Sequence, residues 1–237
     1  MTGQDTSGTA PADGTPRTAV RTPPGARLVI ATHNRKKLAE LRTILAEAGV
    51  DLPSGGLVTS GEIGAPEPVE DGVTFEANAL LKARAVCEAT GLAAVADDSG
   101  LAVDVLGGAP GIFSARWAGR HGDDQANLDL LLAQLADVRP EHRAAGFVCA
   151  AALVTPDGTE EVRTGEMRGF LTQAPRGTNG FGYDPVLVPD RQSPSAEGTP
   201  GTRTAAELDP AQKNAISHRG RAFRALAPLV VRALGES

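Results

Sequence analysis

Cysteine, aromatic residues and long apolar runs are all scarce in this sequence. Among its 237 residues the only cysteines are Cys87 and Cys149, and aromatic residues make up 3%. Two cysteines this far apart form neither a disulfide framework nor a C-x-x-C zinc motif, and they fit a reducing cytoplasm. No apolar run approaches the roughly 18 residues that are needed to cross a bilayer. We therefore expect a soluble cytoplasmic protein with a core of Ala, Val and Leu.

The N-terminal segment, residues 1–26, has almost no large apolar side chain and is rich in Thr, Gly, Pro and Ala. It also lacks the basic start and apolar stretch of a signal peptide. Such a segment cannot bury enough surface to offset the entropy cost of ordering, so a disordered tail is predicted. One domain is expected over residues 27–237, with a flexible polar insert at 190–203.

Basic residues are also fewer than acidic ones: the chain has 23 Lys and Arg and 29 Asp and Glu, which gives a net charge of -6. This balance argues against a nucleic-acid binder and against binding to an anionic membrane. It leaves room for a small basic pocket that accepts a phosphate-bearing ligand.

Apolar periodicity alternates between helical and strand spacing, which predicts a mixed α/β fold with helices on both sides of a central sheet. Strands are predicted at 27–32, 92–96, 101–106, 144–156, 160–171 and 181–189. The pair 144–156 and 160–171 is expected to be antiparallel around an Asp-Gly turn. Helices are predicted at 33–49, 74–91, 124–138 and much of 204–234, where Pro228 should kink the helix or end a turn.

The turn "ATHNRKK" follows the first predicted strand and opens the first predicted helix. A helix N-terminus offers unpaired N–H groups and a partial positive charge that suit a phosphate, and Lys36 and Lys37 add charge. The glycine spacing of a Walker loop is missing. An ordinary capped surface helix with solvated lysines is the alternative interpretation.

Two acidic clusters are present, one around Glu70 in "EPVEDG" and the other at Asp97 and Asp98 between two apolar runs. The first could be a solvated loop, but the second lies between stretches that should be buried. Oxygen ligands suit Mg²⁺, which takes a few carboxylates and completes its shell with water and substrate phosphate. A carboxylate left outside tight coordination could deprotonate an attacking water.

Two further segments could recognise a flat ligand. In "PRGTNGFGYDP", glycines bracket Phe181 and Tyr183, so the backbone can approach a ligand on which an aromatic ring stacks. In "KNAISHRGRA", Lys213, His218 and Arg219 gather before a helix and could donate hydrogen bonds to a ring oxygen. A Gly/Pro-rich turn and an ordinary basic helix end are the alternatives. The other histidines lack a partner spacing and are interpreted as surface residues.

Taken together, the chain resembles the inosine triphosphate pyrophosphatase family, the dITP/XTP pyrophosphatases. The resemblance runs in order from about residue 27 to the C-terminus through "ATHNRKKLAEL", "EDGVTFEANALLKA", "ADDSGLAVDVLGGAPGIFSARWAG", "GFGYDP", "TAAEL" and "KNAISHRGRA". At two positions the chain departs from the family pattern: His33 stands where a glycine is usual, and Ala77 where a glutamate is usual.

The resemblance implies Mg²⁺-dependent hydrolysis of ITP, dITP and XTP to a nucleoside monophosphate and pyrophosphate. It implies a two-lobed mixed sheet flanked by helices, an active site in the cleft between the lobes, and a homodimer. Asp98 would be the general base, and Glu70 and Asp98 would bind the metal. The substrate would be bound by Thr32, His33, Asn34, Arg35, Lys36, Lys37, Ser99, Phe181, Gly182, Tyr183, Asp184, Lys213, His218 and Arg219.

Three other functions remain open from the residues alone. A related hydrolase could act on a different modified nucleotide, although "KNAISHR" should suit a 6-oxo purine. A nucleotide sensor could keep the pocket without turnover, although a pure binder has no need of the acids at 70, 97 and 98. A nucleic-acid-binding module fits least, given the net charge.

Overall fold

The computed structural model describes residues 20–32, 42–47, 49–50, 52–53, 55–192 and 201–235. The strands are β1 (Leu28–Ile30), β2 (Leu57–Thr59), β3 (Ala93–Val103), β4 (Ala144–Val154), β5 (Glu160–Leu171) and β6 (Leu187–Pro189). The α-helices are α2 (Ser60–Ile63), α3 (Phe75–Thr90), α4 (Asp124–Gln134), α5 (Pro210–Ile216) and α6 (His218–Ala233). Short 3-10 turns are η1 (Asp104–Leu106), η2 (Gly111–Arg116), η3 (Pro140–His142) and η4 (Ala205–Glu207). The predicted mixed α/β fold is confirmed.

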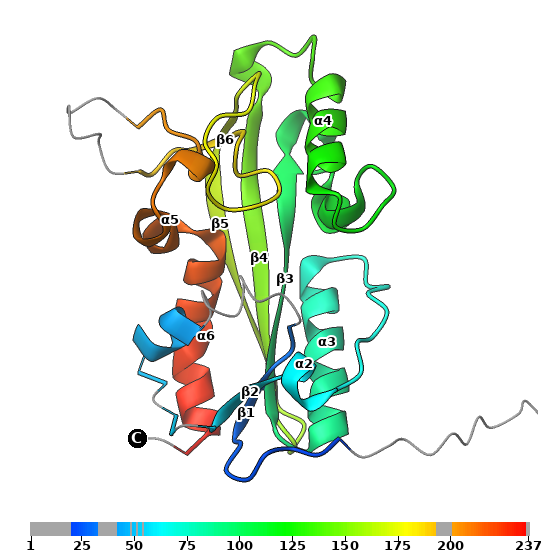
Figure 1. Cartoon of the computed structure of the whole chain (residues 1–237), viewed down its shortest axis with the longest axis vertical. Helices are drawn as coiled ribbons and strands as arrows, with labels where there is room; N and C mark the ends of the chain where they lie inside the picture. The colour runs from blue at the N-terminus through cyan, green and yellow to red at the C-terminus, as the bar shows by residue number, and fades with distance from the viewer. Residues whose placement is uncertain are drawn as a thin grey trace, which may run out of the picture.

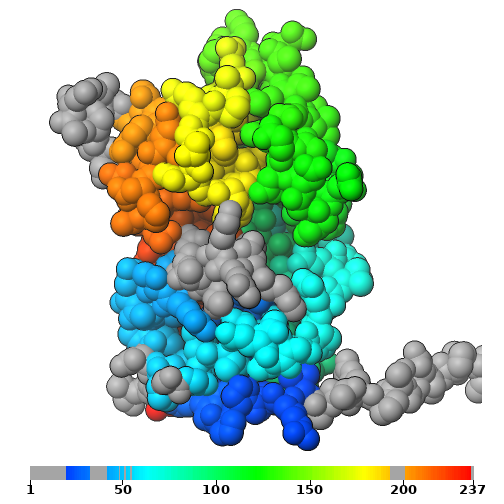
Figure 2. Space-filling view, viewed as in Figure 1, coloured from blue at the N-terminus to red at the C-terminus, as the bar shows by residue number. Residues whose placement is uncertain are grey.

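The strands form one six-stranded sheet in the order β2-β1-β3-β4-β5-β6 (Figure 1). β1 pairs in parallel with β2 and β3, whereas β3, β4, β5 and β6 pair antiparallel. The long strands β3, β4 and β5 run along the molecule, so the segments coloured blue and cyan cover one end of its surface and those coloured green and yellow the other (Figure 2).

Small side chains let helices pack closely on both faces of this sheet. Because side chains alternate along a strand, Ala150 and Ala152 of β4 pack in the core beneath α3, whereas Cys149 and Ala151 pack beneath α6. A third cluster, at the far end of the long strands, joins β3, β4 and β5 to α4. The predicted core of Ala, Val and Leu therefore divides into three parts. No helix in the described part of the chain is long and apolar enough to cross a membrane.

Local sequence signals, such as helix caps and turn residues, predicted the positions of most elements correctly. Thr74 caps α3 by accepting a hydrogen bond from the Ala77 amide, and Gly91 ends the helix in the left-handed region, where glycine lacks the penalty of a Cβ. The predicted hairpin is formed by β4 and β5. The helix predicted at 33–49 is described only in part, and residues 42–47 are helical.

Two predictions about the elements were wrong. The runs on either side of Asp97 and Asp98 are one continuous strand, β3, and not two strands. Residues 53–72, for which no strand or helix was predicted, contain β2 and α2. α6 continues through Pro228, whose side chain is exposed, so the helix does not end there, and the kink that was the other expectation stays a prediction.

Candidate active site

A cavity of about 690 Å³ opens beside the middle of β3. β1 pairs with β3 only from Ala93 to Val95, and beyond this point β4 is the only strand that pairs with β3 within the described residues. Within the described residues, the part of this edge at residues 97–100 borders the cavity, and from Leu101 onward it is covered, because the Leu101 amide donates to Ser114 Oγ of η2 at 2.9 Å. Side chains from both faces of β3 reach the cavity at this edge, which explains why consecutive residues of one strand line it.

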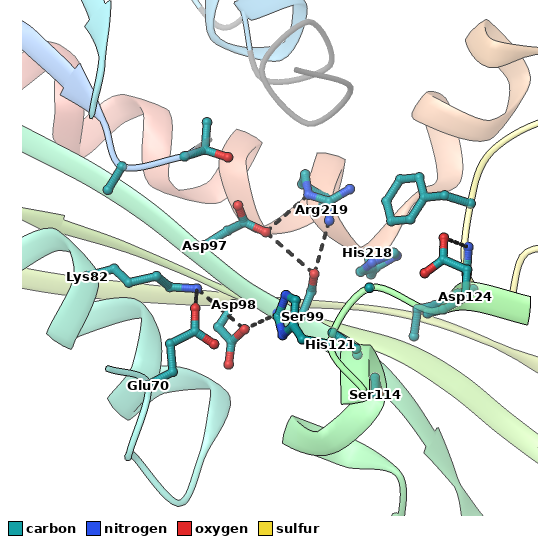
Figure 3. Close-up of a pocket in the computed structure, with 18 of the residues that line it drawn as sticks. Glu70, Lys82, Asp97, Asp98, Ser99, Ser114, His121, Asp124, His218 and Arg219 are labelled. Carbon is teal, nitrogen blue, oxygen red and sulfur yellow. Dashed lines mark hydrogen bonds and ion pairs between the residues drawn. The ribbon is translucent and has the colours of Figure 1, made fainter. Parts of the chain in front are cut away.

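Asp98 points from β3 toward α3 (Figure 3). Its Oδ2 accepts a hydrogen bond from Asn78 Nδ2 at 3.0 Å, and its Oδ1 accepts one from the Ser99 amide at 3.0 Å. Asn78 is held in turn by the Gly72 amide, which donates to its Oδ1 at 2.8 Å. The carboxylate is thereby fixed in direction, with α3 and the loop before α3 as its supports.

Lys82 lies between two carboxylates at the same end of the cavity (Figure 3). Its Nζ is 2.8 Å from Glu70 Oε1 and 3.5 Å from Asp98 Oδ1. Burial lowers the pKa of Lys82, but the attraction of Asp98, Asp97 and Glu70 outweighs it, so the pKa is raised overall. Lys82 is therefore a cation throughout the neutral range.

The carboxylates of Glu70 and Asp98 provide a donor set that suits Mg²⁺. Their oxygens converge on one position, at present next to the Lys82 ammonium, which shows that this position favours positive charge. Groups of three or more potential metal-binding side chains are absent from the described residues. Mg²⁺ commonly binds through one or two carboxylates together with substrate phosphates. The pair therefore fits a Mg²⁺ ion that is completed by a phosphate-bearing substrate.

Asp97 points to the opposite face of β3, toward α6 (Figure 3). Its Oδ2 is 3.2 Å from Arg219 Nε, and Arg219 Nη2 donates to Ser99 Oγ at 3.0 Å. Ser99 Oγ lies 3.5 Å from Asp97 Oδ2 and closes the group of three. Both charged side chains are almost completely buried, at 3% exposure for Asp97 and 2% for Arg219.

A second acid–cation pair forms the wall opposite the β3 edge. Lys213 Nζ is 2.6 Å from Asp184 Oδ2, and this oxygen also accepts the Phe181 amide at 2.9 Å. The Lys213 ammonium lies 5.3 Å from the centre of the Phe181 ring, and the Arg219 guanidinium lies 5.9 Å from it. Both buried carboxylates thus direct a cation toward the same aromatic ring.

His218 and Tyr183 complete this wall from within the core. The His218 ring stacks on Phe147 of β4 with centroids 4.9 Å apart, so its plane is fixed. The Tyr183 hydroxyl donates to the Ser114 carbonyl of η2 at 2.9 Å. Burial, with a smaller contribution from Asp124, raises the pKa of Tyr183 well above its usual value of 10.0.

The arrangement combines two carboxylates around a lysine at one end of a cavity with a cation-flanked aromatic ring at the other. A sequence model described as the Ham1 family matches residues 28–229. The chain belongs to the Ham1 family. Because the matched segment includes both acidic clusters, the predicted phosphate turn and most of the C-terminal basic helix, the family model covers the whole candidate site.

Relatives in the Ham1 family are similar over most of their length. The chain is 62% identical over 209 residues to a dITP/XTP pyrophosphatase of Streptomyces coelicolor, covering 88% of this chain and 99% of the relative. It is 53% identical over 211 residues to a dITP/XTP pyrophosphatase of Corynebacterium efficiens, covering 89% and 100%.

Solved structures agree with the fold. A crystal structure of a dITP/XTP pyrophosphatase from Mycobacterium abscessus is 51% identical with a TM-score of 0.66, covering 86% of this chain and 98% of that one. A HAM1 protein from Coxiella burnetii is 37% identical with a TM-score of 0.74, covering 87% and 99%.

All of the predicted site residues that the structure describes line this cavity. The residues Thr32, Glu70, Asp98, Ser99, Phe181, Gly182, Tyr183, Asp184, Lys213, His218 and Arg219 all line it. His33, Asn34, Arg35, Lys36 and Lys37 lie outside the described residues. Their binding roles stay predictions.

Sequence reasoning missed several residues of the cavity. Asn78 and Lys82 are four residues apart on α3, so they lie on one face of the helix and both reach Asp98. Two polar residues at this spacing among alanines and leucines were a usable signal. His121, interpreted above as a surface residue, lines the cavity from the loop between η2 and α4. No local pattern marks His121, because its place depends on how that loop folds back.

Proposed function

We propose that the protein hydrolyses dITP, ITP and XTP to the nucleoside monophosphate and pyrophosphate. The observation that carries this proposal is that one cavity joins the Glu70–Lys82–Asp98 cluster to Phe181 and its two cations. The first group, once its two carboxylates hold Mg²⁺, suits a triphosphate, and the second suits a flat base. The names of the relatives, dITP/XTP pyrophosphatases, agree with this assignment.

In the proposed reaction Asp98 is the general base. Its donors, Asn78 and the Ser99 amide, fix the directions of both oxygens, and one of these oxygens would accept a hydrogen bond from the attacking water molecule. Proton transfer from that water to the carboxylate generates the nucleophile that attacks the α-phosphorus atom. The bond from this atom to the oxygen shared with the β-phosphate breaks, and pyrophosphate leaves. The Lys82 ammonium, beside Asp98, stabilises negative charge that develops on the phosphate oxygens. Mg²⁺ held by Glu70 and Asp98 would neutralise further phosphate charge.

Base selection follows from the donors around Phe181. Hypoxanthine and xanthine present an oxygen at position 6, which can accept hydrogen bonds from Lys213, His218 or Arg219. Adenine presents an amino group there, and each buried donor left unpaired against it costs roughly 1–3 kcal/mol. Rejection of adenine is therefore expected from these residues, whereas guanine, which shares the 6-oxygen, must be rejected at its 2-position.

We also propose that the elements form two lobes with the active site in the cleft between them. Support comes from the core, in which the clusters under α3 and α6 occupy one end of the long strands and the cluster with α4 the other. The cavity is lined from both ends, by Lys82 of α3 and by Asn127 of α4 among others.

Further proposals concern the rest of the chain. Residues 27–237 form the catalytic domain, and the family match beginning at residue 28 supports this boundary. The tail expected at 1–26 and the insert expected at 190–203 lie largely outside the described residues and stay predictions. The protein works as a cytoplasmic homodimer, and it does not act on nucleic acid or membranes. Val69 and Val73, which are 81% and 85% exposed, would suit a subunit interface. Sedimentation at several concentrations tests the dimer, and an invariant monomer mass would refute it.

The deciding experiment measures pyrophosphate release with Mg²⁺ from dITP and XTP beside dATP, dGTP and dTTP. We expect strong preference for dITP and XTP, and loss of turnover in Asp98→Asn, which keeps the shape of the side chain and removes the base. Asp129→Asn, the same change on the exposed face of α4, is the matched control and should behave as wild type. Equal turnover of all five substrates would refute the 6-oxo preference, and binding of dITP without turnover would indicate a sensor.

A further inference from the structure

We propose that Asp97 is a positioning residue that holds Arg219 against the base-binding end of the cavity, and that it is not a metal ligand. The inference rests on the proposed function, because Arg219 is one of the donors assigned there to the base. It assigns different tasks to the two adjacent aspartates, which an acid pair beside a metal would otherwise be expected to share.

The directions of the two side chains are fixed by β3. Asp97 pairs with Ala151 of β4, a residue of the core beneath α6, whereas Asp98 pairs with Ala150, a residue of the core beneath α3. Neighbouring residues of a strand point to opposite faces. Asp97 therefore faces α6, and the Glu70–Lys82–Asp98 cluster lies on the α3 side of the strand (Figure 3).

The buried charge of Arg219 is unfavourable unless the Asp97 carboxylate compensates it. The guanidinium is 2% exposed and belongs to the first turn of α6, whose N-cap is Ser217. The N-terminal end of a helix carries partial positive charge, which opposes a cation there. A buried charge without a partner is also strongly unfavourable. Asp97, buried beside Arg219 at 3.2 Å, supplies the compensating negative charge.

Geometry gives Asp97 control over the direction of the guanidinium. Asp97 accepts from Nε at 3.2 Å while Ser99 Oγ accepts from Nη2 at 3.0 Å, so two donors of one rigid planar group are fixed. Ser99 follows Asp97 by two residues and lies on the same face of β3. The guanidinium that these two residues fix lies 5.9 Å from the Phe181 ring, where the base is proposed to stack.

The test separates base binding from metal binding. Asp97→Asn keeps the shape of the side chain and removes its charge, and Glu70→Gln is the matched change at a proposed metal ligand. Calorimetry measures binding of deoxyinosine monophosphate without Mg²⁺, and pyrophosphate release from dITP measures KM and the Mg²⁺ concentration for half-maximal rate. For Asp97→Asn we expect about tenfold weaker monophosphate binding and a matching rise in KM. Its Mg²⁺ requirement should match wild type, whereas Glu70→Gln should raise the Mg²⁺ requirement and bind the monophosphate normally.

A double variant guards against a folding defect. Asp97→Asn/Arg219→Met removes both buried charges, and if Asp97 acts through Arg219 this variant should bind the monophosphate no more weakly than Arg219→Met alone. Multiplied losses in the double variant would overturn the inference. So would an Asp97→Asn protein that needs more Mg²⁺ but binds the monophosphate normally, or one that matches wild type in both assays. Failure of wild type to hydrolyse dITP would instead refute the proposed function.

Discussion

Tyr183 is the sole tyrosine of the chain, and its hydroxyl joins two walls of the active-site cavity. It is 4% exposed and donates to the Ser114 carbonyl at 2.9 Å. Tyr183→Phe removes this donor and leaves a buried carbonyl without it. A buried polar group left unsatisfied costs about 1–3 kcal/mol of unfolding free energy. In a domain of this size about 2 kcal/mol corresponds to roughly 4–8 °C in the melting temperature.

The burial of Tyr183 also predicts how stability depends on pH. Burial and the nearby Asp124 raise the pKa of Tyr183 above its usual 10.0. Above that pH the unfolded chain loses the tyrosine proton while the folded protein keeps it, so stability falls by about 1.4 kcal/mol per pH unit from this group. The stabilisation is therefore complete below pH 10.0 and is lost as pH rises through the pKa of the folded protein.

Because no other tyrosine is present, the absorbance of tyrosinate reports Tyr183 alone. We expect the folded protein to ionise at a higher pH than the same protein in denaturant. In chemical denaturation, the stability advantage of wild type over Tyr183→Phe should be constant near neutral pH and shrink in alkaline solution. A folded protein that titrates at the same pH as the denatured chain would refute the reasoning, as would a Tyr183→Phe variant with wild-type stability.

Two further predictions test how the site is supported. Arg143 is 2% exposed and donates to the carbonyls of Val138, Thr172 and Leu135. Arg143→Met should therefore lower the unfolding free energy by about 3 kcal/mol in urea titrations. An unfolding free energy equal to that of wild type within error would contradict this role. Gly165→Ala places a Cβ 2.6 Å from the backbone nitrogen of Ala222. Because β5 must then move away from α6, we expect the variant to lose about 1–3 kcal/mol of unfolding free energy and to have a raised KM for dITP. A variant with lowered stability and an unchanged KM would show that the start of α6 does not move.

The fold was largely predictable because its signals are local. Thr74 and Gly91 mark the two ends of α3, and an Asp-Gly turn separates β4 from β5. The errors arose where tertiary packing overrides local pattern. Polar Asp97 and Asp98 interrupt an apolar run, which suggested two strands, yet buried partners on both faces let β3 continue through them.

The sequence predicted which residues line the cavity better than it predicted which side chains contact one another. Residue type and order named Asp98, Lys213 and Arg219, and these do meet at one cavity. No sequence pattern shows that Lys82 lies between Glu70 and Asp98, because this depends on how α3 and the preceding loop dock on β3. The pairing of Lys82 with Glu70 and Asp98 therefore depends on the tertiary structure and not on a local sequence pattern.

The cavity at the edge of β3 explains why two aspartates stand side by side. On a central strand with neighbours on both edges, consecutive residues face opposite sides of the sheet and share no solvent-filled space. Within the described residues, no strand pairs with this edge of β3 where β1 ends at Ile30, and side chains from both faces line a single cavity. Each carboxylate pairs with a different cation, Asp97 with Arg219 on one face and Asp98 with Lys82 on the other. The strand itself separates two like charges that the sequence places next to each other, so one dipeptide can serve both the proposed base-binding end and the proposed phosphate-binding end of the cavity.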